Sequence, residues 1–342
     1  MRQIPGLICN ETQSETMFPP MVNKAGQSAL RRFPRMRWGI AASAAVAALA
    51  VAGCGSSATS ADTSSTTAVI SAIGAENEYA NVLGQIGGRY VQVSAILDNP
   101  NTDPHTFEAS PAVAQKVSAA QLIVQNGVGY DTWMTKMESA SPNPKRKVIV
   151  VQHLLGLPDS TPNPHLWYGP ATMPKAAKAM AADLSALQPA HAAYFQANLN
   201  AFDRSLTPWR NAIAQFKAKY PNTKVGTTEP VADYLLSAMG IKNLTPFTFQ
   251  LNIMNGVEPA PQDIALENSF FTQHKVKAFA YNQQVTSALT TSIRQTALKA
   301  RVPVVGVYET MPTPGYNYQS WMLAEVEALQ KAVASKVSTQ RL

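Results

Sequence analysis

Residues 67–74 read Thr-Ala-Val-Ile-Ser-Ala-Ile-Gly, and residues 76–86 read Glu-Asn-Glu-Tyr-Ala-Asn-Val-Leu-Gly-Gln-Ile. The first segment is a short apolar run, which is typical of a buried strand. The second has helical spacing, because Tyr79, Val82 and Leu83 fall on one face of a helix. A Gly-Gly pair follows and ends the helix. The two segments together predict the first strand–helix unit of an α/β sheet.

The same alternation continues along the chain. In the first half we expect further strands at 90–97, 121–125 and 147–151, and helices at 111–119, 130–139 and 174–187. In the second half we expect strands at 224–228, 276–281 and 302–307, helices at 231–239, 261–274, 287–301 and 318–335, and an extended segment at 243–249. Apolar strands that alternate with helices indicate parallel sheets with helices on both faces.

A long helical stretch at 188–219 separates the two halves, and Pro208 predicts a kink or break within it. We therefore predict an α/β fold with two lobes, each a parallel sheet flanked by helices. The expected boundaries are 68–187 for the first lobe and 220–342 for the second, with 188–219 as the bridging helix.

The N-terminus resembles a bacterial lipoprotein signal. An apolar run at 38–52 follows several arginines and ends in Val-Ala-Gly-Cys at 51–54, which looks like a lipobox. The run is shorter than the about 20 apolar residues of a membrane span. We expect a signal peptide at 1–53, a lipid-modified Cys54 and a flexible tether at 54–67. Because Met36 would begin a compact signal peptide by itself, we hypothesise that residues 1–35 are an over-extended start.

Composition excludes two classes of protein. Without the six basic and two acidic residues of positions 1–53, the formal net charge falls from +7 to +3. That balance is not typical of nucleic-acid binding, and no basic stripe follows. Only two cysteines are present, Cys9 and Cys54, so a disulfide framework is excluded.

Two stretches echo one another. Residues 103–107 read Asp-Pro-His-Thr-Phe, and residues 163–167 read Asn-Pro-His-Leu-Trp. Each proline fixes its own φ and favours an extended residue before it, so His105 and His165 are presented from stiffened loops. Two imidazoles in fixed positions suggest one metal site.

Two carboxylates complete a plausible ligand set. Glu229 and Glu309 each follow an expected buried strand, where an unpaired charge is costly. The carboxyl ends of parallel strands are also where open α/β folds bind ligands. With His105 and His165, the two glutamates would neutralise a divalent cation.

The other histidines and two nearby acids have lesser expected roles. His153, His191 and His274 have no partner motif and are interpreted as non-ligands. Asp103 and Glu108 are candidates to bond the imidazole N–H groups, with plain capping as the alternative.

These motifs resemble those of the metal-binding substrate-binding lipoproteins of bacterial zinc/manganese ABC importers (cluster A-I, periplasmic solute-binding proteins). The resemblance covers about residues 68–335, and further motifs that carry it are Asn-Gly-Val-Gly-Tyr-Asp-Thr-Trp at 126–133, Val-Glu-Pro-Ala-Pro-Gln-Asp at 257–263 and Val-Pro-Val-Val at 302–305. Asn163 and Gly169 depart from the family pattern, which has Asp at both positions, and the His-rich loop of zinc-specific members is absent. These departures weaken a zinc-only interpretation.

The resemblance implies a non-enzymatic protein that captures one divalent metal ion as cargo in the cleft between the lobes. The cargo would be zinc or manganese, with iron as a further option, held by His105, His165, Glu229 and Glu309. Delivery would be to an ABC permease outside the cytoplasm. The protein would be a monomer that is attached to the cell membrane only by its lipid.

Three other functions remain open at this point. A metal-dependent hydrolase could use a His/His/Glu site, but it needs an open coordination position. A siderophore- or corrinoid-binding protein would leave both Pro-His loops without a role. A surface adhesin is a label often attached to the family, and no residue demonstrates it.

Overall fold

The computed structural model describes residues 69–102 and 104–342. All of these residues belong to one compact unit. The expected signal peptide, Cys54, the tether and Asp103 lie outside the described residues. Within the described ranges, no helix is long and apolar enough to cross a membrane.

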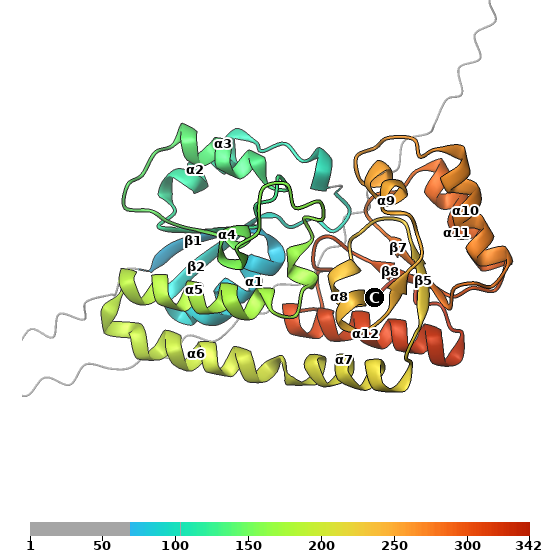
Figure 1. The fold of residues 1–342 in the computed structure, drawn as a ribbon. Helices are drawn as coiled ribbons and strands as arrows, with labels where there is room; N and C mark the ends of the chain where they lie inside the picture. The colour runs from blue at the N-terminus through green and yellow to red at the C-terminus, as the bar shows by residue number, and fades with distance from the viewer. Residues whose placement is uncertain (1–68, 103) are drawn as a thin grey trace, which may run out of the picture. The chain divides into compact units, whose positions relative to one another are not determined.

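The first lobe is a four-stranded parallel sheet with helices on both faces (Figure 1). Its strand order is β2-β1-β3-β4. The strands are β1 Ile70–Glu76, β2 Val91–Leu97, β3 Leu122–Gln125 and β4 Lys147–Val150. The helices are α1 Asn77–Gly87, α2 Pro111–Ala119, α3 Thr132–Ala140, α4 Val151–Leu155 and α5 Thr172–Leu187.

The second lobe repeats this plan, with strand order β6-β5-β7-β8 and parallel pairing throughout. Its strands are β5 Lys224–Thr227, β6 Lys242–Asn243, β7 Ala278–Asn282 and β8 Val304–Val307. Its helices are α8 Asp233–Ala238, α9 Phe247–Met254, α10 Pro261–Thr272, α11 Ala288–Lys299 and α12 Tyr318–Ser335. The two-lobe α/β fold predicted from the sequence is confirmed.

Side chains alternate between the two faces of each sheet, as strand geometry requires. In β7, Ala278 and Ala280 pack into the largest core, whereas Phe279 and Tyr281 pack into a separate core with α9 to α11. Both strand faces are therefore buried, which explains why the strands read as continuous apolar runs.

The largest core continues from one lobe into the other. It contains Ile70 of β1 together with Val225 of β5 and Val305 of β8. Trp167 and Trp321 are fully buried within it. The lobes thus share apolar packing on one side.

Two helices, rather than one, connect the lobes. α6 Ala192–Ser205 and α7 Thr207–Lys219 lie end to end, with α6 packed beside α1 and α5 of the first lobe and α7 beside α12 of the second (Figure 1). The helices meet at Leu206, and Pro208 occupies the first turn of α7, where its missing N–H costs no hydrogen bond. The break expected from Pro208 is therefore present, two residues before the proline.

One expected segment is wrong in its type. An extended segment was expected at 243–249, but β6 ends at Asn243 and α9 begins at Phe247. A helix forms here despite the β-like composition, because Phe249 and Ile253, four residues apart, both pack into the separate core formed with α10 and α11.

Candidate metal centre

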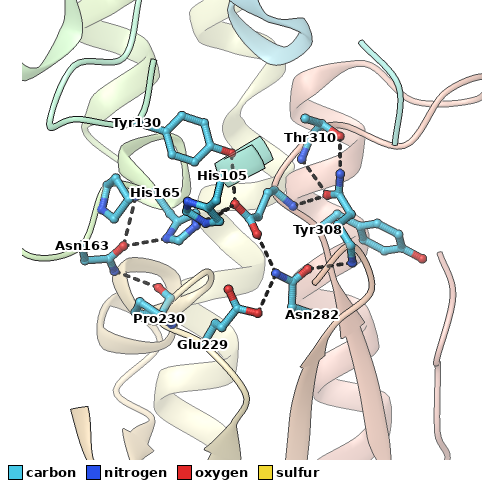
Figure 2. Close-up of polar contacts among 12 residues, drawn as sticks. His105, Tyr130, Asn163, His165, Glu229, Pro230, Asn282, Tyr308 and Thr310 are labelled. Carbon is cyan, nitrogen blue, oxygen red and sulfur yellow. Dashed lines mark hydrogen bonds and ion pairs between the residues drawn. The ribbon is translucent and has the colours of Figure 1, made fainter. Parts of the chain in front are cut away.

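Three of the expected ligands meet in space. Nε2 of His105 lies 3.1 Å from Oε2 of Glu309, and Nε2 of His165 lies 3.2 Å from the same oxygen. One donor atom from each of the three side chains lies within 4.8 Å of the others (Figure 2). The two imidazoles come from the first lobe and the carboxylate comes from the second.

Strand ends place these side chains. His105 lies in a 3-10 turn, Pro104–Thr106, that follows β2, and His165 immediately precedes another, Leu166–Tyr168. Glu309 follows β8, whose last residue is Val307. The segments that follow β2 and β8 therefore supply His105 and Glu309, as is usual for open α/β folds, whereas His165 comes from the loop after α4.

Asn163 fixes the orientation of His165. The amide oxygen Oδ1 of Asn163 lies 2.8 Å from Nδ1 of His165 and also accepts the backbone N–H of His165. Because an amide oxygen can only accept, Nδ1 carries a ring proton. The hydrogen bond from Nε2 to Glu309 therefore needs a second ring proton, and loss of that proton leaves the Nε2 lone pair facing Glu309. Asn163 in turn donates from Nδ2 to the carbonyl oxygen of Pro230, 2.8 Å away in the second lobe. The departure of Asn163 from the usual Asp thus preserves the acceptor that orients the ring.

Burial favours the neutral form of the His165 imidazole. The side chain is fully buried, and this desolvation lowers its pKa, although the hydrogen bond and charge of Glu309 oppose the shift. The neutral imidazole is the form that ligates a metal.

His105 is the solvent-facing member of the group. Its side chain keeps 19% of its surface exposed, whereas those of His165 and Glu309 keep 0%. It lines a hollow of about 510 Å³ with Glu108, Tyr130 and other residues. Glu108, expected as a partner of an imidazole, is exposed beside this hollow.

Glu309 is held by several donors. Tyr130 donates to Oε2 over 3.1 Å, and Asn282 donates from Nδ2 to Oε1 over 2.6 Å. The backbone N–H of Glu309 donates to Oε1 of Gln284. Burial alone would raise the pKa of Glu309, but the charges and hydrogen bonds of the two histidines, His105 first, hold it below its ordinary value. The carboxylate is therefore ionised and rigidly placed.

Glu229 joins the site through Asn282. It lies shortly after β5, is 2% exposed, and accepts at Oε1 from Nδ2 of Asn282 over 3.0 Å. Its carboxylate is outside the group of three that lies within 4.8 Å. The structure thus brings three of the four expected ligands into direct contact and links the fourth through one shared amide (Figure 2).

Sequence reasoning missed Asn282 and Gln284. Asn282 is the last residue of the buried strand β7, and Gln284 lies two residues past its end, as Glu229 and Glu309 lie two residues past β5 and β8. An amide after a buried strand carries the same signal as a carboxylate, because it too needs a buried partner.

The profile of the family described as "ZnuA: Zinc-uptake complex component A periplasmic" matches residues 75–332. The chain belongs to this family. The resemblance noted from the sequence motifs is confirmed by this match.

Curated relatives are metal importer components by name. The chain is 26% identical over 220 residues to "Metal ABC transporter substrate-binding lipoprotein FimA" of Streptococcus parasanguinis, covering 60% of this chain and 70% of the relative. It is 24% identical over 242 residues to "High-affinity zinc uptake system protein ZnuA" of Haemophilus ducreyi, covering 61% of this chain and 76% of the relative.

Several solved structures share the fold of this chain. The structure of FpvC from Pseudomonas aeruginosa in complex with Mn²⁺ matches with a TM-score of 0.63 at 20% identity, covering 78% of this chain and 98% of that chain. A cadmium-bound periplasmic metal-binding protein from Candidatus Liberibacter asiaticus matches with a TM-score of 0.62 at 18% identity, covering 77% and 98%.

Proposed function

We propose that this protein captures a divalent transition metal ion between its lobes and delivers it to an ABC-type permease. The observation that carries the proposal is the convergence of His105 and His165 on one oxygen of Glu309. Relatives named as manganese and zinc importer components support the same cargo class.

The distances suit a metal ion. Ligand atoms about 2.0–2.1 Å from a tetrahedral zinc ion are about 3.3 Å apart. The two N···O separations of 3.1 and 3.2 Å are close to that value. An ion could therefore replace the present hydrogen bonds with small side-chain movements.

The proposed ligands are His105, His165, Glu309 and Glu229. Two neutral imidazoles and two carboxylates balance the charge of a divalent ion, so the buried site becomes neutral when loaded. Four protein ligands also fill a tetrahedral shell and leave no position for the water that a hydrolase needs. Asp103 and Glu108 are proposed to support the His105 loop.

The proposed setting is extracytoplasmic. A lipid on Cys54 would anchor the mature chain to the cell membrane, and residues 54–67 would act as the tether. Residues 1–53 would be removed as the signal peptide, and the lobes would act as a monomer toward the permease.

Metal analysis of protein purified from its host without chelators tests the capture function. We expect about one divalent ion per chain, and a rise in melting temperature when the metal-free protein is loaded, because ligand binding stabilises the native state. The variant His105→Ala should lose most of that rise. The matched control His153→Ala, which alters an exposed residue of α4, should keep it.

Two outcomes would contradict the proposal. A full metal-induced shift in His105→Ala would mean that the site lies elsewhere. Hydrolysis that depends on the bound metal would favour the hydrolase alternative over capture.

A further inference from the structure

We infer that Asn282 limits each carboxylate of the site to one metal-facing oxygen, and so selects an ion that accepts four ligands, such as zinc, against one that prefers six, such as manganese. This inference rests on the proposed function. The observation that carries it is one amide nitrogen shared by Glu229 and Glu309.

The orientation of the Asn282 amide is fixed by its neighbours. Its Oδ1 accepts the backbone N–H of Gln284 over 2.9 Å. A backbone N–H can only donate, so Oδ1 must occupy that side and Nδ2 must face the carboxylates. The side chain is fully buried, and its own backbone N–H donates to Oγ1 of Thr228. Asn282 therefore has no alternative orientation that keeps these bonds.

The two hydrogens of Nδ2 are directed to different carboxylates. One bond reaches Oε1 of Glu309 over 2.6 Å, and the other reaches Oε1 of Glu229 over 3.0 Å. In Glu309 the remaining oxygen, Oε2, is the one that faces both histidines. Bidentate binding by Glu309 would require Oε1 to turn toward the ion and to share its two lone pairs between the ion and the Asn282 amide, which holds Oε1 at 2.6 Å.

The ligand count follows from this arrangement. With Glu229 as the proposed fourth ligand, two imidazole nitrogens and one oxygen from each glutamate make four donors. Four-coordinate tetrahedral geometry is usual for zinc, whereas manganese favours octahedral sites rich in oxygen. A site in which both glutamates could chelate would offer six donors from the same four residues. Asn282 therefore decides between the two counts without binding the metal itself.

The test compares Asn282→Ala with wild type in two measurements. X-ray absorption at the zinc edge gives the number of nearest neighbours, and chelator competition gives the dissociation constants for Zn²⁺ and Mn²⁺. Zinc binds most sites more tightly than manganese regardless of design, so the informative quantity is the ratio of the two constants relative to wild type.

We expect four neighbours around zinc in the wild type and five or six in Asn282→Ala. The preference for zinc over manganese should fall about tenfold or more in the variant. The control Gln283→Ala, whose side chain lies next to Gly306 rather than at the shared amide, should retain the wild-type ratio. Circular dichroism of the metal-free proteins checks that each variant folds.

A second variant tests the same hydrogen-bond donor in case Asn282→Ala does not fold. Asn282→Asp keeps the acceptor for the Gln284 N–H and loses the donor to the glutamates, so it should lower the ratio as well. Unchanged ratios and neighbour counts in the folded variants would overturn the inference. If neither variant folds, more than four neighbours in wild type would overturn it, and four would support it. A wild type that binds neither ion would instead refute the proposed function.

Discussion

Asn163 offers a direct test of how the site prepares His165. Replacing it by Ala removes the acceptor 2.8 Å from Nδ1 of the imidazole and the donor 2.8 Å from the Pro230 carbonyl. The ring then loses the hydrogen bond that sets its tautomer. In the same variant, the second lobe loses one of its links to the Pro-His loop.

The expected magnitude follows from these two losses. Removing a partner that orients a metal-bound imidazole typically weakens metal binding by about 10–100-fold. Leaving buried polar groups unsatisfied typically costs about 1–3 kcal/mol of unfolding free energy. Asn163→Ala should therefore weaken zinc binding by at least about tenfold and destabilise the metal-free protein by about 1–3 kcal/mol.

Asn163→Asp separates the two effects. It keeps an acceptor for Nδ1 and restores the family's usual residue, but it places a carboxylate against the Pro230 carbonyl. We expect zinc affinity equal to or above that of wild type, together with a loss of stability in the metal-free protein. Asn200→Ala, an exposed change on α6, is the matched control and should alter neither quantity.

Chelator competition measures the affinity, and urea unfolding of the metal-free protein measures the stability. An Asn163→Ala variant that binds zinc within twofold of wild type would refute the role assigned to the Asn163–His165 bond. So would an Asn163→Asp variant as weak as Asn163→Ala.

Two further predictions concern the scaffold. Burial raises the pKa of Glu325, which accepts from Tyr168, to about 8, so the folded chain keeps a proton that the unfolded chain loses above about pH 4.5. The stability contributed by this proton is complete below that pH and is lost as the pH rises toward 8. Glu325→Gln should therefore gain unfolding free energy relative to wild type between pH 5 and 8, by up to roughly 1.4 kcal/mol per pH unit in urea titrations. A difference that does not change with pH would contradict the assignment. Gly74→Ala would place a Cβ against the backbone nitrogen of Ala80 and should destabilise the protein by about 1–3 kcal/mol or more. The Cβ of Gly84→Ala would meet only one atom, at 3.9 Å, so this variant should be neutral or stabilising. Equal melting temperatures for the two variants would contradict this packing argument.

The sequence determined the architecture because its signals are local. Apolar runs bounded by helical patterns identify parallel strands wherever they lie, and the break near Pro208 follows from the missing N–H of one residue. The segment at 243–249 was predicted as extended but is partly helical, because Phe249 and Ile253 pack into a core that forms only when distant elements assemble.

The two histidines of the site could also be predicted from the sequence. Pro104 and Pro164 stiffen the chain beside His105 and His165, and this constraint acts over two or three residues. Their convergence on Glu309 agrees with the expected set, and the ligand roles of all four residues stay predictions.

Tertiary structure alone decided how the carboxylates are used. Glu229 and Glu309 follow β5 and β8, and Asn282 ends β7. Nothing in their sequence separation shows that one amide nitrogen donates to both acids. That sharing depends on the register of β5, β7 and β8 and on the Gln284 N–H that turns the amide. The residue types of the proposed metal site can be predicted from local sequence, whereas the hydrogen bonds that orient its carboxylates exist only in the folded protein.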